Sequence, residues 1–269
     1  MRTRMTVAVV SGALALSALA VPAVPAAQAA GIAGAVDDER PQILAASVNG
    51  GKPIVLGTST AKTVTVSITA SHPSGIRDVF GYLWTGQHVE DPKIRILIHR
   101  DWADSCKDIN ATTATCTFSG VINPKVLKNT DARTWNLFAG AWGKVGRDSV
   151  VEVDAFTTAK LQRQSRLTVS ATPKPVKKGK TLTVTGKLSR ANWDAKKYAG
   201  YAGQSVKLQF RKKGTDTYTT IKTVKGSSTG ALKTTTTKTT AEGYWRWSFA
   251  GTATTPAVNA PGTLVKIKK

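Results

Sequence analysis

The residues that most often carry out catalysis are few in this chain and widely spaced. The histidines are His72, His88 and His99, and none has a second histidine at the spacing of a metal site on a strand or a helix. No Gly-x-Ser-x-Gly segment or other nucleophile signature occurs. Spacing does not exclude a serine, a histidine and a carboxylate that folding brings together. We therefore predict a protein that is not an enzyme and has no catalytic residue, with a hydrolase in the N-terminal half as the alternative.

A group of acidic residues offers the oxygen ligands that calcium prefers. Asp101, Asp104, Asp108 and Asn110 lie close together in the sequence, and oxygens from such a loop suit a hard cation. The EF-hand pattern is absent, and Lys107 lies inside the group. Two interpretations stay open: a calcium site, which would make calcium the one candidate cofactor, or acidic loop residues that balance nearby arginines.

The N-terminus has the three parts of an export signal. Arg2 and Arg4 precede an apolar stretch, and small residues end at Ala29. We predict cleavage after Ala29, a disordered segment at 30–40, and a secreted protein that associates with the cell wall. A membrane anchor is the alternative, but two prolines interrupt the apolar stretch, and no later segment approaches the length of a transmembrane helix.

The two cysteines of the chain enclose a short polar segment. Cys106 and Cys116 are separated by nine residues that include turn-forming Asp108 and Asn110. Because export places the protein in an oxidising environment, we predict a disulfide that closes a loop or hairpin. A reactive thiol pair is the alternative, but the Cys-x-x-Cys spacing is absent.

Charge divides the rest of the chain into two parts. The chain has 38 Lys+Arg and 16 Asp+Glu, a formal net charge of +22. Residues 30–164 carry 15 basic and 13 acidic side chains, whereas residues 165–269 carry 21 basic and three acidic ones. A polar stretch joins the two parts. We predict a first domain at 41–157, a linker at 158–166 and a basic second domain at 167–269.

Apolar and polar residues alternate with a period of two in both predicted domains. Val64, Val66 and Ile68 share one face of an expected strand, and turn signals separate such runs. The second domain has expected strands at 167–171, 181–188, 205–211, 218–224, 231–239, 244–249 and 263–267. No stretch has the 3.6-residue period of a helix. The pattern predicts an all-β protein with two immunoglobulin-like β-sandwiches in tandem.

Aromatic residues divide into expected core and expected surface. Trp245, Trp247 and Phe249 alternate with polar residues, which favours a buried face of the second sandwich. Trp102 lies in the acidic loop, and we expect it to be exposed. Trp193, with two nearby tyrosines in a Gly-rich loop, is a candidate for stacking on sugars or bases.

The basic residues of the second domain are the strongest quantitative feature of the sequence. On the expected strand at 205–211, Lys207 and Arg211 share the face opposite Val206 and Leu208, so charge would cover one side of a sheet. A net charge of +18 attracts polyanions. We predict an anionic cell-wall or extracellular polymer as the partner, without specificity for nucleic acid. Lysines that only maintain solubility and protect sheet edges are the alternative. The candidate residues are Lys177, Lys178, Lys180, Lys196, Lys197, Lys207, Arg211, Lys212 and Lys213.

One part of the second domain resembles a known class of repeat. The segment 203–211 reads Gly-Gln-Ser-Val-Lys-Leu-Gln-Phe-Arg, and Thr229-Gly230 and the aromatic-Arg strand at 244–251 follow it. This order resembles the bacterial immunoglobulin-like repeats of secreted and surface proteins. The export signal and the Lys-rich second half are similar to actinobacterial secreted proteins that are often labelled hypothetical or calcium-binding. The resemblance implies a fold and a location, and it covers residues 167–269 more specifically than residues 41–156.

Overall fold

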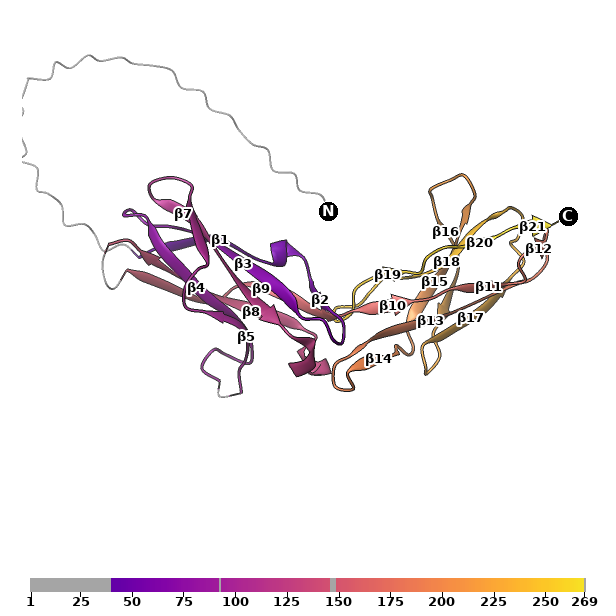
Figure 1. Ribbon diagram of the computed structural model, residues 1–269, viewed down its shortest axis with the longest axis horizontal. Coiled ribbons are helices and arrows are strands. Elements are labelled where there is room, and N and C mark those ends of the chain that lie inside the picture. Colours follow the sequence, from indigo (N-terminus) through magenta and orange to yellow (C-terminus); the bar gives the residue numbers. More distant parts are fainter. Residues whose placement is uncertain (1–39, 92, 146–148, 269) are drawn as a thin grey trace, which may run out of the picture. The chain divides into compact units, whose positions relative to one another are not determined.

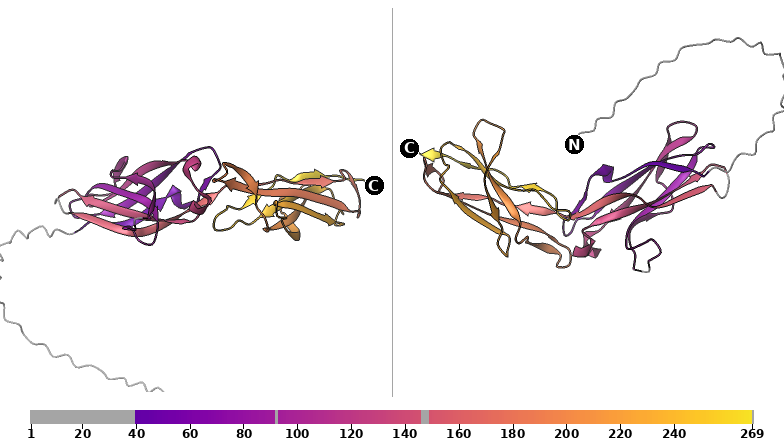
Figure 2. Two further views of the ribbon diagram at one scale, coloured as in Figure 1. Left: turned by 90° about the horizontal axis from the view of Figure 1, so that it is seen from below. Right: turned by 180° about the vertical axis from the view of Figure 1, so that it is seen from behind.

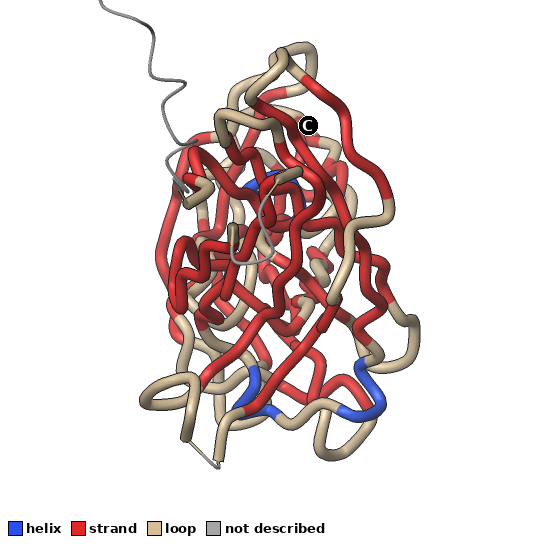
Figure 3. The backbone as a smooth tube through the Cα atoms, turned by 90° about the vertical axis from the view of Figure 1, so that its left-hand side faces the viewer, coloured by secondary structure: helices blue, strands red, loops and turns tan. Residues whose placement is uncertain are grey.

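The computed structural model describes residues 40–91, 93–145 and 149–268. The predicted signal peptide and nearly all of the predicted disordered segment lie outside the described residues. The described part consists of β-strands and short 3-10 turns at Asn49–Gly51, Pro124–Val126 and Asn129–Asp131 (Figure 3). None of its helices is long and apolar enough to cross a membrane.

The first sandwich consists of two sheets with the strand order of an immunoglobulin domain. One sheet has the order β1-β3-β7-β6, and the other has the order β2-β9-β8-β4-β5 (Figure 1). In immunoglobulin notation these are the ABED sheet and the GFCC′ sheet, with β2 added in parallel to β9. The strands are β1 Gln42–Val48, β2 Ile54–Leu56, β3 Lys62–Ser71, β4 Ile76–Thr85, β5 Arg95–Arg100, β6 Ser105–Asp108, β7 Thr113–Ile122, β8 Thr134–Gly143 and β9 Val150–Arg163.

The second sandwich has a related plan with its own strand pairing. Strand β13 pairs with β10 and β11 on one side and with β14 and β17 on the other. The facing sheet has the order β16-β15-β18-β19, with β20 also paired to β18, and β12 pairs in parallel with β21. The strands are β10 Ser165–Leu167, β11 Ser170–Thr172, β12 Val176–Lys177, β13 Leu182–Asn192, β14 Lys197–Gly200, β15 Ser205–Lys212, β16 Thr219–Lys225, β17 Ala231–Thr236, β18 Gly243–Phe249, β19 Val258–Asn259, β20 Thr263–Val265 and β21 Ile267–Lys268. Figure 2 shows both sandwiches from two further sides. The all-β class and the two immunoglobulin-like sandwiches are confirmed.

The period of two places the apolar residues of each sandwich between its sheets. In the first sandwich, Val64, Val66 and Ile68 on β3 are buried with Phe118 and Trp135 from β7 and β8. Each such side chain contributes roughly 1.5–3 kcal/mol by leaving water. The facing sheets therefore pack through one alternate set of residues and leave the other set outside.

The core of the second sandwich contains the aromatic residues expected there. Trp245, Trp247 and Phe249 on β18 are buried, so the sequence prediction is confirmed. Trp247 lies against Gly186, where a Cβ atom would come within 2.7 Å of the indole, and its Nε1 donates to the carbonyl oxygen of Thr185 at 3.0 Å. Glycine at this position therefore makes room for the largest side chain of the core.

Two features differ from the sequence predictions. Strand β9 continues to Arg163 and β10 begins at Ser165, so the segment 158–166 predicted as a linker is mostly strand. Trp193 is fully buried, because it joins the core cluster of the first sandwich and donates from Nε1 to the carbonyl oxygen of Gly57 at 2.7 Å. The expectation that Trp193 is available for stacking is therefore wrong.

Candidate functional site

The outer surface of the sheet β16-β15-β18 carries an array of arginine and tyrosine side chains. On β15, Val206 and Leu208 are buried, so Lys207 between them and Arg211, four residues further on, lie on the opposite, outer face. The same alternation on β18 places Tyr244 and Arg246 outside. The antiparallel register pairs Arg211 with Tyr244 and Gln209 with Arg246, which brings them together on adjacent strands.

The guanidinium groups of this surface lie over tyrosine rings. The Cζ atom of Arg246 lies 3.7 Å from the ring centroid of Tyr218, and that of Arg211 lies 4.5 Å from Tyr244 and 5.3 Å from Tyr218. Arg246 Nε also donates to Gln209 Oε1 at 2.9 Å. We call Gln209, Arg211, Tyr218, Tyr244 and Arg246 the arginine–tyrosine face. Cation–π contacts hold its guanidinium groups in place, which lowers the entropy lost when they bind a ligand.

Acidic side chains compensate little of this charge. Asp216 Oδ1 lies 3.9 Å from Arg211 Nη1, and the Asp216 side chain is exposed, so this ion pair is weak. Glu242 pairs instead with Lys213 at 3.1 Å. Asp194, the third acidic residue of the second half, accepts a hydrogen bond from the backbone of Asn129. The positive charge of the two guanidinium groups is therefore little compensated by acidic side chains of the second half.

The basic residues predicted to bind a polyanion lie in separate parts of the second sandwich. Lys177, Lys178 and Lys180 are exposed at and after β12, whereas Lys196 and Lys197 are exposed at β14. Strands β12 and β14 lie at opposite ends of this sandwich (Figure 1). The third part contains the remaining candidates, Lys207, Arg211, Lys212 and Lys213, all on or directly after β15.

The sequence reasoning missed most of the arginine–tyrosine face. Of its five residues, only Arg211 was among the polyanion-binding candidates. Tyr244 and Arg246 belong to the alternating stretch 244–249. The tryptophans of this stretch indicate a buried face, and the residues between them point outward. The outward positions of that same alternation were the available signal. No signal in the sequence places Tyr218 between the two arginines, since it precedes β16 and reaches the face through the β15-β16 turn.

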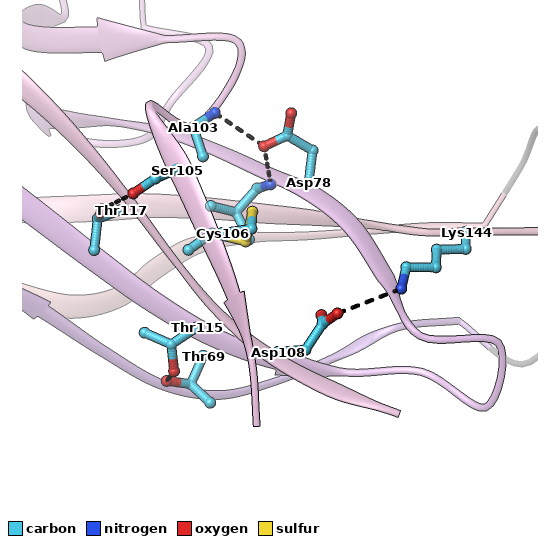
Figure 4. The surroundings of a disulfide bond; sticks show 11 residues. Thr69, Asp78, Ala103, Ser105, Cys106, Asp108, Thr115, Thr117 and Lys144 are labelled. Atoms are coloured by element: carbon cyan, nitrogen blue, oxygen red, sulfur yellow. Dashed lines mark hydrogen bonds and ion pairs between the residues drawn. A yellow bond between two sulfur atoms is a disulfide. The ribbon is translucent and has the colours of Figure 1, made fainter. Parts of the chain in front are cut away.

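The candidate calcium ligands each have another partner. Asp108 Oδ2 lies 3.8 Å from Lys144 Nζ beside the disulfide (Figure 4). Asp104 Oδ2 accepts from the backbone N–H of Ser119 at 2.7 Å, and Asp101 Oδ1 lies 3.4 Å from His99 Nε2. Asn110 Oδ1 accepts from the backbone of the following turn. Across residues 40–91, 93–145 and 149–268, no group of three or more His, Cys, Asp or Glu side chains has the arrangement of a metal site. Calcium binding stays a prediction.

The disulfide prediction is confirmed. Cys106 on β6 and Cys116 on β7 are direct partners in the ladder and are joined through sulfur (Figure 4). The bond therefore lies within one sheet rather than between the sheets. Asp78 on β4 holds the segment that leads into β6, because its Oδ1 accepts a hydrogen bond from the backbone N–H of Ala103 at 2.9 Å.

One histidine forms a contact that resembles part of a hydrolase site. His72 is buried, and its Nε2 lies 2.9 Å from the Oγ of the buried Ser149. The backbone N–H of Ser74 donates to His72 Nδ1 at 3.1 Å, so Nδ1 is the acceptor and Nε2 carries the proton. This tautomer donates to Ser149 and does not withdraw its proton. His88 and His99 are both exposed.

Aromatic side chains of β4 and β8 stack on one another at the outer surface of the first sandwich. Trp102 is 56% exposed, as expected, and stacks on Trp142 with centroids 4.9 Å apart. Trp142 stacks on Phe80 at 4.1 Å, and Tyr82 stacks on Phe138 at 4.5 Å. Burial, followed by the charges of two carboxylates on β9, raises the pKa of Tyr82. Because the faces of these rings stack on one another, the cluster favours a structural role that stiffens the sheet.

The strand orders and the two separate cores define the class of this protein: an immunoglobulin-like protein of two β-sandwiches. No protein-family model matches the chain, and no curated protein does. Among solved structures, the chain is similar to amphioxus IgVJ-C2, with 9% identity, 79% of this chain and 99% of that chain covered, and a TM-score of 0.26. It is also similar to the adhesin InvE of Yersinia pseudotuberculosis, with 12% identity, 84% and 58% covered, and a TM-score of 0.25. The assignment of the fold rests on the strand order.

Proposed function

We propose that the protein is an extracellular binding protein without enzymatic activity, and that the arginine–tyrosine face binds an anionic cell-wall or matrix polymer. The observation that carries this proposal is the pair of guanidinium groups held over tyrosine rings, with one weak ion pair to an exposed carboxylate. Arginine forms bidentate hydrogen bonds with phosphate and carboxylate groups, which suits the repeating anions of such a polymer.

The remaining lysines support the same interaction in a less specific way. The net charge of +18 on residues 165–269 raises the local concentration of a polyanion and accelerates its encounter with the second sandwich. The lysines at β12 and β14 lie away from the arginine–tyrosine face, so they contribute long-range attraction while the face supplies the direct contacts.

The test compares variants of equal net charge. The purified protein is titrated with a fluorescently labelled polyphosphate across a salt series. We expect Arg211→Gln/Arg246→Gln to weaken binding more than the matched control Lys178→Gln/Lys180→Gln, because only the first pair removes direct contacts. The slope of log K against log salt should fall by roughly one for each lost contact.

A second variant separates charge from geometry. Arg211→Lys/Arg246→Lys preserves the net charge but removes the planar guanidinium groups, so we expect weaker binding at an unchanged long-range attraction. Equal losses for the arginine pair and the lysine pair would show that net charge alone acts. Binding that does not respond to salt would contradict the proposal entirely.

A further inference from the structure

Two arginines near the end of β9 contact the same loop, and no ion pair of the described residues involves either of them. Arg163 is the last residue of β9 and is 8% exposed. Its backbone N–H donates to the carbonyl oxygen of Thr254 at 3.0 Å, which places it beside the loop at 250–257. Arg190 lies on β13 and donates from Nη1 to the hydroxyl oxygens of the same loop, at 3.0 Å to Thr255 and 3.4 Å to Thr254. Thr254 thus contacts both arginines.

The Arg163 side chain lacks the partners that a buried charge needs. Its Nε is inaccessible to solvent and has no hydrogen-bond acceptor. Among the described residues, no ion pair involves Arg163 or Arg190. The Arg190 guanidinium lies 3.8 Å from the ring centroid of Tyr201, an aromatic contact and not an ion pair. Buried charges in proteins are normally paired, and an unpaired one is strongly destabilising.

Within the described residues, the electrostatic environment of Arg163 also lacks a nearby negative charge that would compensate its own. Burial, and next the charge of Arg190, lower the pKa of Arg163 to about 10. Burial also lowers the pKa of Arg190. Asp194 is the carboxylate whose charge acts on Arg163 in the opposite direction, and it is the smallest of the contributions. Two positive charges therefore lie together in a partly dehydrated place.

We propose that Arg163 and Arg190 form a site for a single oxyanion group, such as a phosphate, a sulfate or a carboxylate. Such an anion supplies the missing counter-charge, accepts hydrogen bonds from both guanidinium groups, and can also accept from the hydroxyl of Thr254. Arg190 and Thr254 are partly exposed, so the anion enters from their side. The site is separate from the arginine–tyrosine face and does not depend on the function proposed for that face.

The experiment titrates the purified protein with inorganic phosphate and with sulfate in a chloride buffer of constant ionic strength. Calorimetry and the melting temperature are the two readouts. We expect saturable binding of one anion per chain and a melting temperature that rises with anion concentration. Chloride at the same ionic strength should give neither effect. Absence of saturable binding by the unaltered protein would overturn the proposal, whatever the variants do.

Variants then locate the site. We expect Arg163→Gln and Arg190→Gln each to weaken phosphate binding by about tenfold or more, because each removes a charge-assisted contact. Arg133→Gln is the matched control, since Arg133 is exposed and its Nε donates to the carbonyl oxygen of Thr130. An equal loss in the control would show non-specific attraction and would refute the site. A polyphosphate arm distinguishes a free ion from an anionic group on a polymer. Polyphosphate that displaces bound phosphate would show that the site accepts a group on a polymer, whereas phosphate binding that polyphosphate does not change would show a site for the free ion. Arg211→Gln/Arg246→Gln should leave phosphate binding unchanged, because these residues belong to the separate arginine–tyrosine face.

Discussion

Replacing Arg163 by methionine should stabilise the protein. Methionine keeps an unbranched side chain that reaches about as far as Nε, but it removes the charge of a residue that is 8% exposed and has no acceptor for its Nε. The pKa of Arg163 lies at about 10 against an ordinary value of 12.5, and the free-energy cost of the charged form is then up to about 3 kcal/mol. We expect Arg163→Met to raise the free energy of unfolding by about 1 to 3 kcal/mol at pH 7 in a phosphate-free buffer.

The pH dependence gives this prediction a second readout. Below about pH 10 the guanidinium is protonated in both the folded and the unfolded protein, so the whole cost is present. As pH rises above the folded pKa, the folded protein loses the proton first, and the unfolded protein binds more protons. The stability of the unaltered protein relative to Arg163→Met should therefore rise above pH 10, and the advantage of the variant should shrink.

Urea denaturation at pH 7 and at steps up to pH 11 measures both effects. Arg133→Met is the control, since Arg133 is exposed, and we expect a change within about 0.5 kcal/mol. Added phosphate should reduce the advantage of Arg163→Met if the anion site exists. A variant that is less stable than the unaltered protein at pH 7 without phosphate would refute the reasoning, because it would mean that Arg163 makes a net favourable contact.

Three further predictions concern stability. Trp193→Ala should destabilise the protein by about 3–5 kcal/mol in urea denaturation, because the indole is fully buried; a loss under about 1 kcal/mol would contradict its place in the core. Cys106→Ser/Cys116→Ala should cost about 3 kcal/mol through the loop of sequence separation 10, measured against the oxidised protein; an unchanged melting temperature would count against it. Gly140→Ala should cost about 1–3 kcal/mol by thermal denaturation, because its Cβ would lie 2.1 Å from the Phe80 ring; a neutral result would show that the ring moves freely.

Local alternation made part of the fold predictable. The period of two predicts that Val206 and Leu208 face one side of β15 and that Lys207 and Arg211 face the other. The structure has this arrangement. Strand β5 shows the limit of that rule. Ile98 has φ of +55°, and the β4-β5 register shifts nearby, so the period of two is interrupted in this strand. An irregular backbone of this kind leaves no mark in the hydrophobic pattern.

Contacts between distant segments were beyond prediction from the sequence. Trp193 is bonded to Gly57 and Asn129, which are 136 and 64 residues away. Polar neighbours and glycines made its loop resemble an exposed one, but the burial of a large apolar surface outweighs these local preferences. The sequence also does not predict that Arg163 and Arg190 contact the same loop, since each residue alone is one more basic side chain in a basic region.

The distribution of arginine contacts changes what the net charge implies. Lysines at β12 and β14 are exposed, and an exposed ammonium on a flexible stem attracts an anion without fixing its position. Arg211 and Arg246 lie over aromatic rings, Arg190 donates to the hydroxyl groups of Thr254 and Thr255, and Arg163 is 8% exposed. Because the side-chain entropy of these arginines is largely lost in the free protein, their anion contacts cost less to form. Under the proposed function, the lysines would govern how fast an anion arrives and how strongly salt opposes it, and the arginines would determine where it binds.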